Sequence, residues 1–292
     1  GLFRLSEKLF DIEVVEANGE APIWHEDVLF FNILNKGGRK IASFYLDPYS
    51  RPETKRGGAW MDECLNKSKD QNGENILPVA YLVCNQTPPS NGKPSLMSFD
   101  EVQTLFHESG HGLQHMLTKI DFPQAAGINN VEWDAVELPS QFMENWCFDK
   151  KTLLNIAKHY ETGEKLHEED YEKLCANRTF NCGMGTLRQL HFAITDLRLH
   201  SNLSSYKELN SDEIRRDIAK NTTLLPPINE DKFLCCFSHI FAGGYSAGYY
   251  SYKWAEVLSA DAFSMFEEAG LENEQEIKDI GKRFKETILS LG

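Results

Sequence analysis

Three side chains within a stretch of five residues have the types and spacing of a metal site. His107 and His111 are four positions apart, and Glu108 lies between them. On a helix, residues at this spacing lie one turn apart with Cβ atoms about 5–6 Å from each other. Two imidazoles can therefore reach one zinc ion, which binds imidazole nitrogen at about 2.0–2.1 Å. Glu108 would lie beside the ion, where its carboxylate can take a proton from water.

The segment that carries these residues has the pattern of an amphipathic helix. Ser98 and Glu101 have the spacing of a capping box, which predicts that the helix begins there. One face is apolar and consists of Val102, Leu105, Phe106, Ser109, Leu113, Met116 and Leu117. On a helical wheel, His107 and His111 fall at about 140° and 180° from Val102, on the opposite face. We therefore expect both imidazoles to face a cleft.

Two other interpretations of the pattern stay open. The histidines could belong to an ordinary solvated helix face that binds nothing. His111 and His115 also have a spacing of four residues. Only the pair His107 and His111 has a glutamate at the second position, and we favour that pair for this reason.

A catalytic zinc site needs a third protein ligand. The acidic residues downstream that could supply it are Glu132, Asp134, Glu137 and Glu144. Asp134 and Glu137 could instead form a capping box for a helix over residues 139–148. Sequence spacing alone does not choose among the four carboxylates.

The composition excludes several classes of partner. The chain has 292 residues, of which 41% are hydrophobic, and a net charge of −14. A negative field repels phosphate backbones, so we expect no nucleic acid partner. No apolar run approaches the ~20 residues that span a bilayer, so we expect no membrane partner. The seven cysteines include no CxxC pair, and apolar surroundings such as those of Cys235 and Cys236 predict free buried thiols in a reducing compartment.

The periodicity changes along the chain from that of strands to that of helices. After a short first helix, β-rich runs at 12–15, 28–34, 40–46 and 79–84 predict strands, and 66–74 reads as an exposed loop. From residue 98 onward, helical spacing predicts helices at 152–160, 168–178, 185–200, 211–220, 249–269 and 272–291. We therefore predict an α+β fold, predominantly helical, with a small mixed sheet.

Longer stretches resemble the thimet oligopeptidase family of zinc peptidases, and most closely its oligopeptidase A branch. The similarity covers the motif at 107–111 and the segments 133–146, 52–60, 79–85 and 238–254. The resemblance implies a zincin-type metallopeptidase catalytic domain over residues 1–292, with a sheet-containing part at 1–97 and a helical part at 98–292 that holds the zinc. It implies that Glu137, in its Val-Glu-Leu-Pro-Ser-Gln context, is the third zinc ligand.

The resemblance also implies that His239, Tyr245 and Tyr252 face the metal and stabilise the tetrahedral intermediate. Imidazole and phenol groups can donate hydrogen bonds to the oxygen on which charge develops. The alternative is an aromatic helix face packed in the core. Gly243, Gly244 and Gly248 argue against it, since glycine favours a mobile loop or a close approach to substrate.

The chain departs from the family pattern in sequence and in extent. Ser109 stands where the family usually has Phe, which removes an apolar contact under the helix, and Gln114 replaces a frequent His. The long helical N-terminal half of the family and a short C-terminal tail are missing. Because the chain begins at Gly1, it reads as a piece cut from a longer protein.

The function implied is that of a zinc-dependent metalloendopeptidase that hydrolyses short peptides, with one Zn²⁺ per chain and Glu108 as general base. We expect the full-length protein to be a monomer. We expect it to be cytoplasmic, or to lie in an organelle interior if a removed N-terminal segment carried targeting information. The alternatives are a dipeptidyl carboxypeptidase of the same family and a catalytically silent peptide-binding module.

Overall fold

The computed structural model of the chain describes residues 1–201 and 210–291 and divides it into two compact units. The first unit contains Gly1–Glu132, Val136–His167 and Leu258–Gly292, and the second contains Trp133–Ala135 and Glu168–Val257. The expected division at residue 97 stays a prediction.

The first unit contains a five-stranded mixed sheet in the order β1-β2-β3-β7-β4. Strands β3 and β7 are parallel, and the other neighbouring strands are antiparallel. The strands of this sheet are β1 (Ile12–Glu16), β2 (Leu29–Asn35), β3 (Lys40–Tyr49), β4 (Trp60–Leu65) and β7 (Val79–Gln86). A separate two-stranded sheet pairs β5 (Ser68–Lys69) with β6 (Asn75–Ile76).

The alternation of apolar residues along the strands places side chains on both faces of the sheet. Phe31 and Ile33 of β2 belong to the large core, together with Phe44 and Leu82 of the neighbouring strands. Phe30 points to the opposite face, where it packs in a smaller cluster with Ala17, Val28 and Tyr45. The sheet is therefore covered by apolar contacts on both sides.

The four predicted strands are present, and three further strands, β4, β5 and β6, were not predicted. Strand β4 carries Asp62 and Glu63, which interrupt the apolar alternation, and it is stabilised by antiparallel pairing with β7. The predicted loop over 66–74 was partly wrong, because Ser68 and Lys69 pair with Ile76 and Asn75. Such pairing depends on a second segment of the chain, and a local pattern does not report it.

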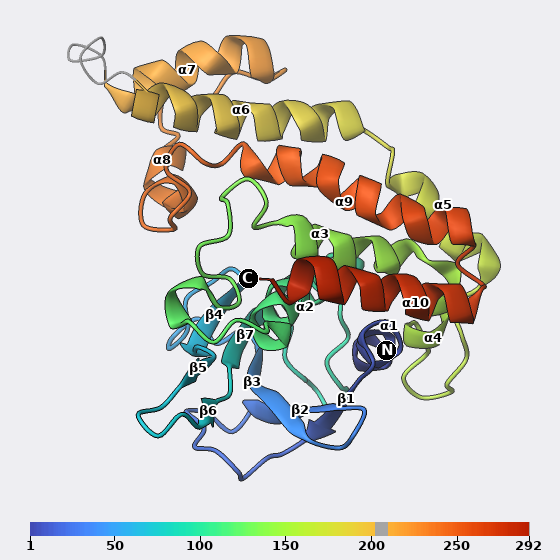
Figure 1. The fold of residues 1–292 in the computed structure, drawn as a ribbon. Coiled ribbons are helices and arrows are strands. Elements are labelled where there is room, and N and C mark those ends of the chain that lie inside the picture. Colours follow the sequence, from blue (N-terminus) through green and yellow to red (C-terminus); the bar gives the residue numbers. More distant parts are fainter. Residues whose placement is uncertain (202–209, 292) are drawn as a thin grey trace. The chain divides into compact units, whose positions relative to one another are not determined.

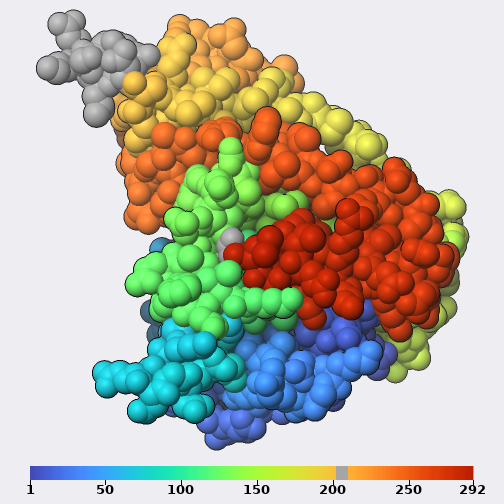
Figure 2. Space-filling model, viewed as in Figure 1, coloured from blue at the N-terminus to red at the C-terminus, as the bar shows by residue number. Residues whose placement is uncertain are grey.

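The helices of the first unit surround the large core. They are α1 (Leu2–Phe10), α2 (Phe99–Leu117), α3 (Leu138–Asn145), α4 (Lys150–Ile156), the part of α9 (Ser251–Ala269) from Leu258 onward, and α10 (Glu274–Phe284), which continues as a π-helical turn over Lys285–Leu289. Helix α2 packs against β3, β4 and β7 and against α3 (Figure 1). Helices α1 and α10 come from opposite ends of the chain and lie side by side (Figures 1 and 2).

The second unit is helical in the part that the structure describes. Its helices are α5 (Glu168–Asn177), α6 (Cys182–Ser201), α7 (Ser211–Thr222), α8 (Phe233–Cys236) and the start of α9 (Ser251–Ala269). Helices α6 and α7 pack against each other.

Three 3-10 turns complete the described secondary structure of the two units, at Pro123–Ala125, Trp146–Phe148 and Ser238–Ile240.

The predicted fold class, helix-dominant α+β with a small mixed sheet, is confirmed. Among the described residues, no helix is both long enough and apolar enough to cross a membrane.

The cysteines are free, as predicted, but most of them are not buried. Only Cys84 and Cys147 are buried. Cys182, Cys235 and Cys236 are exposed, so the prediction of a buried environment for the 235–236 pair was wrong. The apolar neighbours Leu234 and Phe237 pack into the core of the second unit while the two thiols between them point outward.

Candidate metal centre

Helix α2 begins where the sequence predicted and presents both histidines from one turn to the next. The Ser98 Oγ accepts a hydrogen bond from the Glu101 N–H at 3.2 Å, and a Glu101 carboxylate oxygen accepts one from the Ser98 N–H at 2.7 Å. The predicted capping box is confirmed. The ring centroids of His107 and His111 are 5.0 Å apart, as expected for residues on consecutive turns.

Glu137 meets both imidazoles with a single carboxylate oxygen. Its Oε2 lies 3.2 Å from His107 Nε2 and 3.1 Å from His111 Nε2. One ligand atom from each of the three residues lies within 4.8 Å of the others. In a tetrahedral zinc site with bonds of about 2.0–2.1 Å, neighbouring ligand atoms lie about 3.3 Å apart. The distances from Glu137 Oε2 to the two imidazole nitrogens are close to that spacing.

Glu137 lies at the start of helix α3. Glu137 occupies the N-cap position of α3 and makes no side-chain capping bond, so the alternative capping box with Asp134 does not form. Pro139 lies in the first turn, where its missing N–H costs nothing. The Ser140 Oγ donates to Glu137 Oε2 at 2.8 Å and orients the carboxylate.

Glu144 occupies a second layer around the cluster. Its Oε1 lies 2.6 Å from His107 Nδ1, on the side of the ring away from Glu137. A carboxylate at Nδ1 fixes the proton on that nitrogen and leaves Nε2 free to bind a metal. Among the described residues, Glu137 is the one of the four acidic candidates that groups with His107 and His111. Glu144 instead contacts the far nitrogen of the His107 ring.

The charges in the cluster are strongly coupled. Burial alone would lower the pKa of His107, but its contacts with Glu137 and Glu144 raise that pKa well above its usual value. Burial alone would raise the pKa of Glu137, but His111 and His107 hold that pKa well below its usual value. The Glu137 carboxylate thus favours positive charge between the two imidazoles. Either protons on the imidazoles or a bound cation can supply that charge.

Glu108 is buried beside the cluster without being a member of it. Its side chain is 6% exposed, and burial is the main cause that raises its pKa. The positive charges of His107 and His111 and the nearby backbone of Met61 oppose this rise in pKa. A buried carboxylate with a raised pKa is a stronger base than an exposed one, as a general base requires.

The donor set fits a catalytic metal. Two imidazole nitrogens and one carboxylate oxygen are the ligands of one well-known class of catalytic zinc site, in which a fourth position stays open to water or substrate. The second-layer contacts of Glu144 and Ser140 are of the kind that orient such ligands.

The other three predicted site residues lie together in the second unit. The rings of Tyr245 and Tyr252 are stacked, with centroids 5.1 Å apart and planes 17° apart. The His239 ring lies 6.0 Å from Tyr245 and 6.4 Å from Tyr252. Both tyrosines also pack against the small core around Phe237 and Tyr249. The role of the three residues at a metal therefore stays a prediction.

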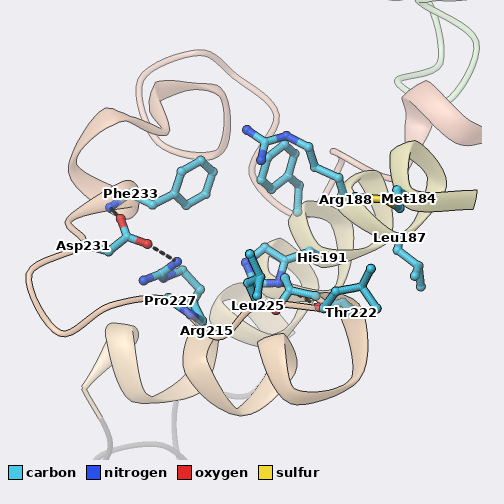
Figure 3. Close-up of a pocket in the computed structure, with 13 residues that line it drawn as sticks. Met184, Leu187, Arg188, His191, Arg215, Thr222, Leu225, Pro227, Asp231 and Phe233 are labelled. Carbon is cyan, nitrogen blue, oxygen red and sulfur yellow. Dashed lines mark hydrogen bonds and ion pairs between the residues drawn. The ribbon is translucent and has the colours of Figure 1, made fainter. Parts of the chain in front are cut away.

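A cavity of about 580 Å³ lies elsewhere in the second unit, between α6, α7 and the segment before α8 (Figure 3). Its lining is mainly apolar. The polar groups within it are largely paired, since Arg215 contacts Asp231 at 3.0 Å and His191 Nδ1 contacts Thr222 Oγ1 at 2.9 Å. None of the predicted site residues lines this cavity.

The supporting roles of Ser140 and Glu144 were not predicted from the sequence. Glu144 was considered only as a possible metal ligand, and Ser140 only as part of the segment around Glu137, whereas both contact the candidate ligands from α3. Asp196 and His200 of α6 form an i, i+4 acid–histidine pair that the sequence does display. Only the structure shows that Asp196 also binds the segment that carries Tyr245.

A family model matches the entire chain. The model for Peptidase family M3 covers residues 1–292. The chain belongs to peptidase family M3. This agrees with the resemblance predicted from residues 107–111 and the segments around them.

Relatives within the family are named oligopeptidase A. The M3 chain is 58% identical to the organellar oligopeptidase A, chloroplastic/mitochondrial, of Arabidopsis thaliana, across the whole chain and 37% of that relative. It is 58% identical to the probable cytosolic oligopeptidase A of Arabidopsis thaliana and 47% identical to the oligopeptidase A of Escherichia coli, across the whole chain and 42% of each. The chain spans about two fifths of the length of these relatives.

Proposed function

We propose that this M3 chain is the catalytic part of a zinc-dependent endopeptidase that hydrolyses short peptides. The observation that carries the proposal is the convergence of His107, His111 and Glu137, whose ligand atoms lie within 4.8 Å of one another. The family membership supports a peptide as substrate, and the names of the relatives support an oligopeptidase.

In this proposal, His107, His111 and Glu137 hold one zinc ion. A bound zinc acts as a Lewis acid that lowers the pKa of water and polarises the carbonyl of the peptide bond. Ser140 and Glu144 keep the ligands in orientation through their contacts with Glu137 and His107. The choice of zinc rests on the nitrogen and oxygen donor set.

Glu108 has the role of general base in the same proposal. Its carboxylate accepts a proton from the attacking water and can then give that proton to the departing amine. The burial that raises its pKa suits both halves of this task, because the group must first bind and then release a proton.

His239, Tyr245 and Tyr252 have the role of hydrogen-bond donors to the developing oxyanion. Their clustering within the second unit supports a common role, because one imidazole and two phenols then face the same region. Loss of one such donor typically costs about 2.7–4 kcal/mol of transition-state stabilisation. Tyr252→Phe should therefore lower kcat and leave KM nearly unchanged.

The test separates binding of the metal from catalysis. Glu108→Gln should retain stoichiometric zinc and lose activity by about 10²–10⁴-fold, because an amide does not accept the proton. Glu137→Ala should lose zinc itself. Zinc content by elemental analysis and cleavage of a quenched fluorescent peptide give both quantities. Full activity in Glu108→Gln, or undiminished zinc in Glu137→Ala, would contradict the assignment.

The two alternatives predict different products. A dipeptidyl carboxypeptidase releases C-terminal dipeptides and would be blocked by a C-terminal amide, whereas an endopeptidase cuts an amidated peptide internally. Mass spectrometry of the products of matched free-acid and amidated peptides distinguishes the two. A silent peptide-binding module would bind these peptides without cleaving either.

The proposed compartment is the cytoplasm or the interior of an organelle. Relatives whose names place them in the cytosol and in chloroplasts or mitochondria match the chain equally well, at 58% identity.

A further inference from the structure

Residues 238–250 form a Gly-rich segment that consists of one 3-10 turn and a series of hydrogen-bonded turns. Ala247 has a φ of 58° and Gly244 a φ of 86°, so the chain is in the left-handed region at both positions. Alanine rarely adopts that conformation, because its Cβ crowds the following carbonyl oxygen. The backbone bonds within the loop are accompanied by a contact from outside it at the Ala247 N–H. The loop carries Tyr245 and leads into Tyr252.

Asp196 of α6 supplies that contact. Its Oδ1 accepts a hydrogen bond from the Ala247 N–H at 2.8 Å, and its Oδ2 accepts one from the Tyr249 N–H at 2.9 Å. The carboxylate has no exposure to solvent. Buried hydrogen bonds to an ionised carboxylate are among the strongest that a backbone amide can make. The two oxygens of Asp196 thus accept hydrogen bonds from two residues, Ala247 and Tyr249, that are separated by one position in the chain.

His200 orients this carboxylate from one turn further along α6. Its Nδ1 lies 2.8 Å from Asp196 Oδ1 and 2.9 Å from the Asp196 backbone oxygen. Oδ1 is therefore held between an imidazole and the Ala247 amide. The side chain of Asp196 has no freedom to rotate without breaking contacts on both oxygens.

The segment bound by Asp196 also packs tightly against Trp133. A Cβ atom at Gly248 would lie 2.2 Å from the Cδ1 of Trp133, so the loop backbone rests against that indole. The Trp133 ring also contacts Tyr245, with centroids 4.8 Å apart. Asp196 and Trp133 therefore both constrain the path of the chain between Tyr245 and Tyr252.

We propose that Asp196 is a positioning residue for the reaction and that it acts through the Ala247 and Tyr249 amides to hold Tyr245 and Tyr252 in their stacked arrangement. The inference rests on the proposed peptidase function. Without the carboxylate, Ala247 returns to an ordinary backbone conformation, and the two phenols lose their fixed separation. A misplacement of about 1 Å can cost about 100-fold in rate.

The first variant is Asp196→Asn, which keeps the size of the side chain but can accept only one of the two amide hydrogen bonds. We expect kcat to fall by about 10–100-fold, with KM changed less than threefold and zinc content unchanged. His200→Gln should show a smaller fall in kcat, since both amide hydrogen bonds to Asp196 remain. This variant replaces Asp196→Asn as the test if Asp196→Asn does not fold. Unchanged kcat in both variants would overturn the proposal.

A double-mutant cycle with Tyr252→Phe tests whether Asp196 acts through the tyrosines. If it does, Tyr252→Phe should cost much less in the Asp196→Asn background than in the wild type. Independent, additive losses would mean that Asp196 has a general structural role. The matched control is Asp231→Asn, because Asp231 Oδ1 accepts the Phe233 N–H at 2.8 Å in another turn of the same unit. That substitution should combine additively with Tyr252→Phe.

The wild type and Glu108→Gln, measured in the same assay, keep the two hypotheses apart. If the wild type shows no Glu108-dependent cleavage, the proposed function fails. If it shows such cleavage and the cycle is additive, the function stands and the role of Asp196 is refuted.

Discussion

The backbone of Gly110 lies directly against the carbonyl of Pro139. A Cβ atom at position 110 would stand 2.3 Å from the Pro139 oxygen and 2.5 Å from the Ser140 Cα. No side chain other than hydrogen fits there, and neither obstacle is the flexible end of a side chain. Gly110 therefore permits helices α2 and α3 to come close enough for Glu137 to meet His107 and His111.

Gly110→Ala should separate the two helices and weaken zinc binding. We expect a loss of at least about 10-fold in zinc affinity, comparable to disturbance of a metal ligand's support. Gly112→Ala is the matched control on the same helix, because its Cβ would meet the flexible Leu82 side chain at 2.8 Å. Competition with a fluorescent zinc chelator measures both variants. Equal affinities for Gly110→Ala and the wild type would show that α3 does not need this close approach.

Glu144→Gln should reduce zinc affinity while the ligands remain in place. The amide cannot hold the proton of His107 Nδ1 as the carboxylate does at 2.6 Å, and such supporting contacts are typically worth about 10–100-fold in affinity. Glu132→Gln is a suitable control, because Glu132 is exposed and lies outside the metal cluster. The same chelator competition applies. A larger effect at Glu132 would contradict the assignment of Glu144.

Asp47→Asn should destabilise the first unit. The Asp47 side chain is 3% exposed and makes contacts with Arg51 at 2.7 Å and Lys55 at 2.9 Å, and it also accepts from Trp24 Nε1 at 3.0 Å. Removal of one partner from a buried ion pair typically costs about 3–5 kcal/mol, because the other charge stays buried. Urea unfolding at neutral pH measures the loss. The control is Asp70→Asn, because Asp70 is an exposed turn residue whose carboxylate accepts from the Asn72 and Glu74 amides. A loss for Asp47→Asn no larger than that for Asp70→Asn would contradict this role.

The same residue predicts a pH dependence in the acid range. Burial alone would raise the pKa of Asp47, but hydrogen bonds from Arg51, Lys55 and Trp24 lower it below its usual value. The group therefore binds a proton more readily in the unfolded chain, where its pKa is about 3.9. Its contribution to stability is complete above that pH and disappears as the pH falls through the lower folded pKa. The difference between wild type and Asp47→Asn should shrink over this interval.

Ser109→Phe should destabilise the chain, although the family resemblance led us to expect Phe at this position. Ser109 lines a cavity of about 20 Å³ beneath α2, far smaller than a phenyl ring, and Phe3 of α1 lines the same space. Overpacking of this kind costs about 1–3 kcal/mol. Phe3→Ala in the Ser109→Phe background should recover part of the loss. Thermal unfolding of the four variants tests this, and an increase in Tm for Ser109→Phe alone would contradict it.

Local patterns predicted those parts of the molecule that are stabilised locally. The start of α2 followed from Ser98 and Glu101, whose two reciprocal bonds lie within one turn. Helical geometry alone predicted that His107 and His111 lie on the face opposite the apolar stripe of α2. Strand β4 was missed because its stability comes from pairing with β7, some twenty residues further along the chain.

The identity of the proposed third ligand could not be derived from residue spacing alone. Glu137 and Glu144 are both acidic, and both contact His107, one at Nε2 and the other at Nδ1. Their difference in position arises from the approach of α3 to α2, and spacing along the chain does not contain that information. The family resemblance pointed to Glu137, and the geometry gives Glu144 a separate position.

The two buried cysteines make the opening of the first unit measurable. Cys84 and Cys147 are fully buried, and burial raises the pKa of Cys84 to about 12 and that of Cys147 further still above its usual value. Neither thiol can react with an alkylating reagent until the protein around it opens. Cys182, Cys235 and Cys236 react at once, because they are exposed. The rate of the slow phase of alkylation therefore reports how often the first unit opens. If the proposed zinc site is present, added zinc should make this phase slower.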